Sequence, residues 1–115
     1  MEFLPLYEGQ PVFGDIDAAL RALGFAFHRF VNLEGRTLRD SGFADTVETR
    51  SQHLFADAVY TRPIGSWGGL PSAQLLKLAL MLNCFYNSAD FCGYLLRMHD
   101  GRDGTDFFRQ YTAAF

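Results

Sequence analysis

A glycine-rich connector, Pro63 to Leu70 (PIGSWGGL), divides the chain into two parts whose apolar residues follow different patterns. Before it, short apolar stretches alternate with polar segments, as in strands joined by a helix and loops. After it, apolar residues recur at helical spacing almost to the end of the chain. We therefore expect a β-α-β-β segment over residues 1–62, a connector over residues 63–70 that acts as a hinge, and a helical extension over residues 71–115 packed on the same domain.

The first part is predicted to begin with a strand and a helix. Glu2 to Glu8 alternates apolar and other residues, and Pro5 limits it to an edge strand or a strand with one unpaired side. The helix is predicted over Pro11 to Leu23, because its apolar residues follow helical spacing and Gly24 can end it.

Two further strands follow this helix. Phe25 to Leu33 predicts a strand whose change of phase at His28–Arg29 indicates a bulge. Glu34 to Ser51 is polar and predicts a long loop or a loose hairpin arm. His53 to Thr61 (HLFADAVYT) is apolar on both faces apart from Asp57. Two apolar faces are typical of a central strand that is covered on both sides.

The second part is predicted to be helical throughout. Pro71 to Tyr86 predicts an apolar helix, Ser88 an N-cap for a helix through Met98, His99 to Gly104 a turn, and Asp106 to Ala113 a final short helix. The first of these helices is apolar nearly all the way round. It is either buried in its own domain or packed with one side on another chain.

Charge and composition exclude several classes of protein. The net charge is −3, and Lys77 is the single lysine, so phosphate neutralisation on a nucleic acid is not expected. The N-terminus lacks the pattern of a signal peptide, and the most apolar stretch, Leu75 to Tyr86, is too short to span a bilayer. Cys84 and Cys92 lie too far apart along a helix for a disulfide unless the chain folds back, which predicts reduced thiols and a cytoplasmic protein.

Two segments together resemble a known family. The run FLPLYEGQPVFGDIDAALRALGF, with its core at Leu4 to Phe25, is followed by HLFADAVYTR around Leu54 to Tyr60. In this order they resemble the C-terminal part of FkbM-type methyltransferases, which use S-adenosylmethionine. The resemblance implies an α/β fold, a fragment of a doubly wound sheet. Its strands here would lie in the spatial order first, third, second, with Leu54 to Tyr60 in the middle.

The same resemblance implies that the cofactor site is missing. Family members bind S-adenosylmethionine through a glycine-rich turn after their first strand and an acidic residue at the end of the second, both in a preceding half that this chain lacks. We therefore expect no catalytic residue, no cofactor-binding residue and no bound cofactor in this chain alone, with S-adenosylmethionine binding only if the missing half is supplied. The expected function is that of a methyltransferase-derived module that acts by self-association or partner association.

Two other functions remain open. The chain is either the C-terminal fragment of a complete FkbM-like methyltransferase or a small-molecule binding domain with an aromatic pocket around Trp67 and the phenylalanines. The substrate-side candidates are Tyr7, Glu8 and Gln10, because ligands gather at the carboxyl ends of strands in open α/β sheets. Tyr7 could stack on a substrate and Glu8 could orient an acceptor group. Alternatively, Glu8 and Gln10 cap the following helix.

Other polar residues are predicted to have structural roles. Asp57 interrupts an apolar strand and is expected to pair with Arg29, Arg50 or His53, or to be exposed. The run from His99 to Asp106 resembles a calcium loop but lacks its alternate-position spacing and closing glutamate, which favours a solvated turn. No zinc motif is formed by the soft ligands His28, His53, His99, Cys84 and Cys92.

The resemblance also leads to an expected oligomeric state. Without the missing half, the edge of Glu2 to Glu8 and the apolar side chains beside it would be uncovered. A symmetric dimer would cover both, and Pro5 favours an interface dominated by side chains over long strand pairing. Such an interface should bury on the order of 2,000 Å² or more.

Overall fold

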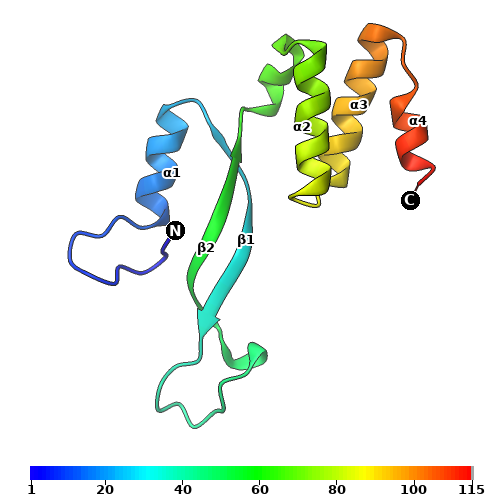
Figure 1. The fold of residues 1–115 in the computed structure, drawn as a ribbon. Helices are drawn as coiled ribbons and strands as arrows, with labels where there is room; N and C mark the ends of the chain where they lie inside the picture. Colours follow the sequence, from blue (N-terminus) through cyan, green and yellow to red (C-terminus); the bar gives the residue numbers. More distant parts are fainter. Residues whose placement is uncertain (115) are drawn as a thin grey trace. The chain divides into compact units, whose positions relative to one another are not determined.

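A computed structural model describes residues 1–114 and gives a mixed α/β structure with two compact units, Met1–Pro63 (unit 1) and Ile64–Phe115 (unit 2). Each unit is described by itself. Figure 1 shows the elements in chain order: α1 (Phe13–Ala22), β1 (Ala26–Arg36), η1 (Val47–Thr49), β2 (Gln52–Thr61), η2 (Ile64–Gly69), α2 (Ser72–Cys84), α3 (Ala89–Asp103) and α4 (Phe107–Thr112), where η denotes a 3₁₀ helix.

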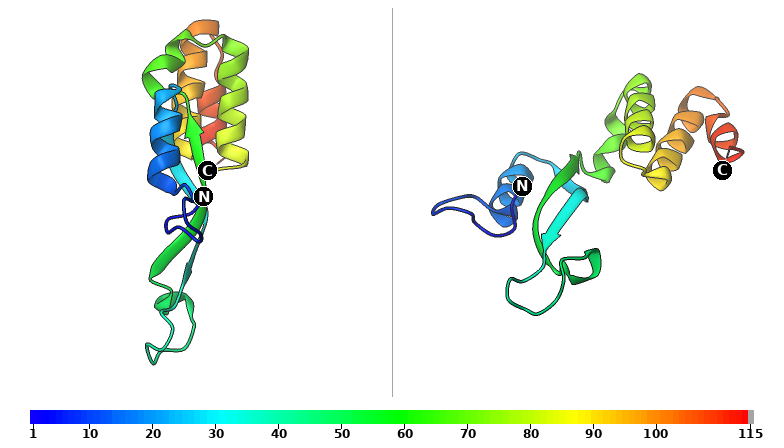
Figure 2. Two further views of the ribbon diagram at one scale, coloured as in Figure 1. Left: turned by 90° about the vertical axis from the view of Figure 1, so that its left-hand side faces the viewer. Right: turned by 60° about the horizontal axis from the view of Figure 1, so that its bottom comes forward.

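Unit 1 is a long hairpin with one helix beside it. β1 and β2 pair antiparallel from Ala26↔Thr61 to Arg36↔Gln52 (Figures 1 and 2). The register shifts between Phe27 and Arg29, where the change of phase in the sequence predicts a bulge. A second shift falls between Val31 and Glu34, around Asn32, whose φ is 53°.

The predicted first strand, Glu2 to Glu8, is wrong. Its one ladder contact is an isolated antiparallel bridge between Glu2 and Phe55, with the Phe3 amide donating to the Leu54 carbonyl at 2.9 Å. Pro5 has no amide hydrogen to continue such pairing. Beyond it the chain turns back at Gly9, whose φ is 78°. The described chain therefore has a two-stranded sheet, and neither the predicted order first, third, second nor a methyltransferase-like sheet is formed.

Helix α1 begins at Phe13, later than predicted, because the cap lies there. The Asp15 carboxylate accepts a hydrogen bond from the Val12 amide at 3.0 Å, which satisfies a free donor at the helix start. Gly24, with φ 91°, follows the end of the helix and turns the chain into β1. The predicted helix and its glycine stop are thus present, with a shorter N-terminal end.

Unit 2 is a helical unit with its own core. Helices α2, α3 and α4 stand side by side in chain order (Figures 1 and 2). The predicted turn over His99 to Gly104 is wrong, because α3 continues to Asp103 and ends at Gly104 in the left-handed conformation, with φ 68°. The buried core contains Trp67, Leu75, Ala79, Leu82, Cys92, Leu95 and Leu96.

The glycine-rich connector belongs to this core. Residues Ile64–Gly69 form η2, and the Trp67 side chain within it is 1% exposed. The Arg102 guanidinium, near the end of α3, donates hydrogen bonds to the carbonyl oxygens of Gly68 and Leu70. The segment predicted as a hinge is therefore anchored to unit 2 by a buried ring and two side-chain hydrogen bonds.

The two units differ sharply in burial. In unit 1, all of whose residues are described, only Gly35 and Ala56 are buried. Helix α1 has no buried residue, whereas α2 and α3 both contribute to a closed core. Among residues 1–114, no helix combines the length and apolar character needed to cross a bilayer.

Candidate functional site

Unit 1 is held together by an aromatic cluster, which we define as Phe3, Phe13, Phe27, Phe30 and Tyr60. The Phe30 ring lies at its centre, with ring centroids 5.2 Å from Phe3, 5.1 Å from Phe13 and 4.7 Å from Phe27. Most of these rings meet edge to face, an arrangement worth about 0.5–1.5 kcal/mol for each pair beyond area burial. The cluster joins the N-terminal segment and α1 to one face of the hairpin.

A polar contact closes one end of this cluster. The Tyr60 hydroxyl donates a hydrogen bond to the Asp17 carboxylate at 2.6 Å, which links β2 to α1. Burial, together with this negatively charged acceptor, raises the pKa of Tyr60 to about 12. The Tyr60 hydroxyl therefore keeps its proton at physiological pH and acts as a structural donor.

Beside the cluster lies an open apolar surface, which we define as Leu23, Phe25 and Phe27. Their side chains are 73%, 37% and 40% exposed. Phe25 and Phe27 border a hollow of about 430 Å³ between α1 and the start of β1, whose wall also includes Phe13 and the polar pair Asp17 and Arg21. Leu23 precedes Gly24 of this wall in the sequence. Apolar side chains that protrude next to a hollow are typical of a surface that packs on another protein.

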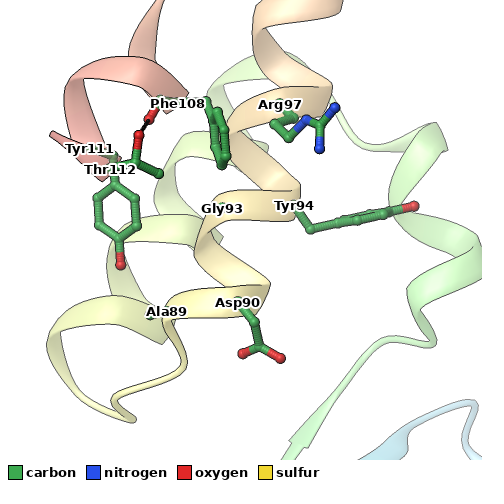
Figure 3. Close-up of a pocket in the computed structure, with 8 residues that line it drawn as sticks. All are labelled: Ala89, Asp90, Gly93, Tyr94, Arg97, Phe108, Tyr111 and Thr112. Atoms are coloured by element: carbon green, nitrogen blue, oxygen red, sulfur yellow. Dashed lines mark hydrogen bonds between the residues drawn. The ribbon is translucent and has the colours of Figure 1, made fainter. Parts of the chain in front are cut away.

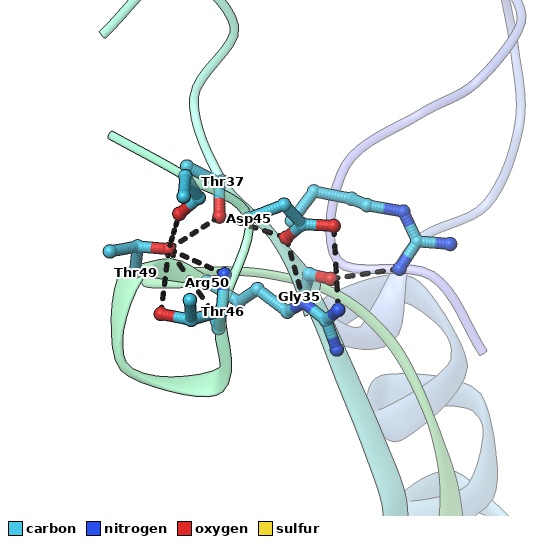
Figure 4. A network of polar contacts seen from close by, with 8 residues as sticks. Gly35, Thr37, Asp45, Thr46, Thr49 and Arg50 are labelled. Atoms are coloured by element: carbon cyan, nitrogen blue, oxygen red, sulfur yellow. Dashed lines mark hydrogen bonds and ion pairs between the residues drawn. The ribbon is translucent and has the colours of Figure 1, made fainter. Parts of the chain in front are cut away.

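The hairpin arm predicted as loose is ordered by polar contacts (Figure 4). The Arg50 guanidinium donates two hydrogen bonds to the Asp45 carboxylate, at 2.8 and 3.3 Å, and the Thr37 hydroxyl donates a third at 2.9 Å. These contacts, that of Arg50 first, hold the pKa of Asp45 below its ordinary value. Thr49 adds a hydroxyl contact to Thr37 at 2.8 Å.

A close backbone approach fixes the base of the same arm. A Cβ atom at Gly35 would lie 2.8 Å from the carbonyl oxygens of Arg50 and Gln52, so only glycine fits there. Beyond this point the arm presents large apolar side chains to solvent, since Leu38, Phe43 and Val47 are 78%, 73% and 78% exposed. The arm thus combines a hydrogen-bonded base with exposed apolar side chains.

Unit 2 contains a pocket of about 500 Å³ between α3 and α4 (Figure 3). Ala89 and Gly93 are among the α3 residues that line it. The Phe108 ring approaches Gly93 so closely that a Cβ there would lie 3.2 Å from a ring carbon. The Arg97 guanidinium lies over the Phe108 ring, 5.3 Å from its centroid, at the rim of this pocket.

The predicted substrate-side residues Tyr7, Glu8 and Gln10 lie in the segment before α1. Tyr7 and Glu8 are exposed. The side chain of Gln10 accepts a hydrogen bond from the Leu6 amide and closes the turn, while Asp15 caps the helix. The structure thus gives Gln10 a local role in a loop, and a role in substrate binding stays a prediction for all three.

The predicted exposure of Asp57 is confirmed. Its carboxylate is exposed and accepts a hydrogen bond from the Asn32 amide at 2.9 Å, across the second irregularity of β1. Arg50 pairs with Asp45 instead. The Trp67 ring, expected at an aromatic pocket, is buried against Phe91 in the core of unit 2, and small-molecule binding stays a prediction.

The three carboxylates of the segment that resembles a calcium loop, Asp100, Asp103 and Asp106, each contact different partners. Asp100 accepts hydrogen bonds from the amides of Phe107 and Phe108, at 2.9 and 3.0 Å, and from the Thr105 hydroxyl. These bonds, that of Thr105 first, hold the pKa of Asp100 below its ordinary value. Asp103 pairs with His99, and Asp106 with Arg109. Within residues 1–114, no three His, Cys, Asp or Glu side chains are placed to hold a metal ion.

Sequence reasoning missed the surface formed by Leu23, Phe25 and Phe27. A signal was available, because Leu23 directly follows α1 and two phenylalanines, Phe25 and Phe27, come within four residues of it. The pattern did not identify this surface, since apolar periodicity does not distinguish a face covered by the same chain from a face left open. Comparison of the chain with models of protein families, with curated proteins and with solved structures gave no match.

Proposed function

We propose that this chain acts by association, as a module of methyltransferase-like ancestry that is not catalytic alone. The observation that supports this proposal is the burial of only Gly35 and Ala56 in unit 1. So small a fully buried interior contributes little against the entropy of ordering some 60 residues, at about 1–2 kcal/mol each for the backbone, and the remaining apolar side chains of unit 1 are only partly covered. Unit 1 therefore needs apolar cover from another surface.

The proposed occupant of that surface is a second copy of this chain. Leu23 is 73% exposed and is followed directly by Gly24, which lines the hollow with Phe25 and Phe27, so an exposed leucine and a hollow are neighbours in this part of unit 1. This arrangement is self-complementary, because a two-fold axis would bring each Leu23 to the hollow of the other copy. A stable interface of this kind should bury on the order of 2,000 Å² in total.

A second candidate function has its own observation. The bridge between Glu2 and Phe55 pairs residues at the edge of β2 that does not face β1, and it is antiparallel. A longer strand at this edge would give the order that the FkbM resemblance implies, with β2 in the middle. In that case unit 1 would be the closing part of a complete methyltransferase, and S-adenosylmethionine would bind in the half that supplies the remaining strands. Both cysteines are free, which fits a reducing compartment such as the cytoplasm.

Sedimentation velocity over a micromolar concentration series tests the first proposal. We expect a dimer for the unaltered chain and at least a tenfold weaker association for the double variant Leu23→Ser with Phe25→Ser. Leu38→Ser, which removes a similarly exposed leucine from the hairpin arm, is the matched control and should leave the dimer intact. A folded monomer, or equal weakening by the control, would refute the proposed surface.

Calorimetric titration with S-adenosylmethionine tests what the two candidates share, that this chain alone carries no cofactor site. Both predict no specific heat of binding at any protein concentration. Specific, saturable heat would overturn both.

A further inference from the structure

We infer that unit 2 carries a second, independent interaction surface, through which α3 packs antiparallel on α3 of another copy of this chain. The surface is the stripe Asp90, Tyr94 and Arg97, whose side chains are all exposed. With 3.6 residues per turn, positions spaced by four and then three residues lie on one face of a helix. Figure 3 shows the three side chains following one another along α3.

The charges of this stripe are complementary to themselves. Asp90 and Arg97 are seven residues apart, about 10.5 Å along the helix axis. In an antiparallel pair related by a two-fold axis near Tyr94, the start of one stripe faces the end of the other. Each Asp90 carboxylate then meets the Arg97 guanidinium of the second copy, and the ion pair forms twice. The same two helices packed in parallel would bring like charges together.

The side chains of Arg97 and Tyr94 are already held in place by contacts within unit 2. Stacking on Phe108 holds the Arg97 guanidinium at the rim of the pocket between α3 and α4, so less side-chain freedom is lost when it pairs. Tyr94 is 50% exposed, and the other part of its ring packs near Trp67, with centroids 6.0 Å apart. A half-buried tyrosine at the centre of a surface, flanked by opposite charges, is typical of a specific contact between proteins.

Site-specific cross-linking in the full chain directly tests the two-fold axis near Tyr94. In a Cys84→Ser background, Tyr94→Cys places a thiol where identical residues of two copies meet, within the 4.4–6.8 Å between Cα atoms that a disulfide requires. We expect a disulfide-linked dimer under mild oxidation. Gln74→Cys, on the exposed side of α2, is the control and should stay monomeric on a non-reducing gel. No cross-link at position 94 in a folded protein, or equal cross-linking at position 74, overturns the inference.

Charge reversal tests the ion pairs in the same Tyr94→Cys background. Asp90→Arg alone and Arg97→Asp alone should each slow cross-linking by about fivefold at low salt, since two attractive pairs become repulsive. The double variant restores both pairs and should recover the rate, although it also loses the Arg97 stacking on Phe108. Failure of the double variant to recover the rate overturns the antiparallel register.

This inference does not depend on the association surface of unit 1. The disulfide at position 94 should still form when Leu23 and Phe25 are replaced by serine, after allowance for a lower encounter rate. Weaker association by sedimentation with retained cross-linking at position 94 would support both contacts. Cross-linking without any effect of the Leu23 and Phe25 changes on sedimentation would support α3 alone.

Discussion

Leu82 is the residue at which the closed core of unit 2 can be tested most sharply. Its side chain is 1% exposed on α2, whereas that of Leu80 on the same helix is 62% exposed. Both residues are leucines in the middle of one helix, so replacing either by alanine changes helix propensity equally. The difference between Leu82→Ala and Leu80→Ala therefore measures burial alone.

The expected loss for Leu82→Ala is about 2–5 kcal/mol, the transfer free energy of the side chain plus the cavity it leaves. A unit of this size has a total free energy of unfolding of only about 3–8 kcal/mol. With a urea slope of about 1 kcal/mol per molar, the midpoint should fall by about 2 M or more. Leu80→Ala should stay within about 0.5 kcal/mol of the unaltered chain.

Trp67 makes the assay specific to unit 2, because it is the single tryptophan of the chain and lies in this core, 1% exposed. Urea unfolding followed by tryptophan fluorescence therefore reports on unit 2. Equal midpoints for Leu82→Ala and Leu80→Ala would refute the assignment of Leu82 to a closed core. A large loss for Leu80→Ala would instead indicate that its exposed face is covered.

Three further predictions concern titration and reactivity. The raised pKa of Tyr60 favours the protonated hydroxyl in the folded state, so its contribution to stability is complete below the ordinary value of 10.0 and lost as pH rises through about 12. Tyrosinate absorbance should show a group titrating near pH 12 that Tyr60→Phe removes, whereas Tyr111, whose pKa burial also raises, remains. The pKa of Asp100 is shifted in the opposite direction, so the contribution of its carboxylate to stability is present above the ordinary carboxyl pKa and lost as pH falls through the folded-state value. Asp100→Asn should therefore make acid unfolding, followed by circular dichroism, less steep. Cys84 is exposed, whereas Cys92 is buried and desolvation raises the pKa of its thiol. A thiol reagent should therefore modify one cysteine in the native protein, none in the native Cys84→Ser variant, and both cysteines of the unaltered chain in denaturant. Rapid labelling of Cys92 in the native protein would contradict its place in the core.

The sequence predicted element types well where one local rule decides them. The Pro11 to Leu23 pattern gives α1, and the change of phase at His28–Arg29 gives a shift of register in β1. Local rules failed where two competed. Alternation favoured a strand over Glu2 to Glu8, but Pro5 and the turn at Gly9 prevent one within this chain. Gly101 was taken as part of a turn, although an exposed helix tolerates it at about 1 kcal/mol and Gly104 is the actual stop.

The candidate surfaces could not be predicted in the same way. Apolar spacing predicts a helix that contains Leu75, Leu80 and Leu82, of which Leu75 and Leu82 are buried and Leu80 is exposed. Whether a given face of this helix is covered depends on which elements fold against it. The order of the hairpin arm likewise depends on Asp45 meeting Arg50 and Thr37, contacts that only the folded loop brings together. Length and polarity alone predicted a loose segment there.

Amide hydrogen exchange at several protein concentrations tests the central claim, that unit 1 relies on association whereas unit 2 is closed by its own core. Protection of the amides in β1 and β2 should rise with concentration and fall in the Leu23→Ser, Phe25→Ser variant. Protection of the core amides of α2 should be independent of concentration. Strong protection of β1 and β2 in a dilute monomer, unchanged by the variant, would contradict the account.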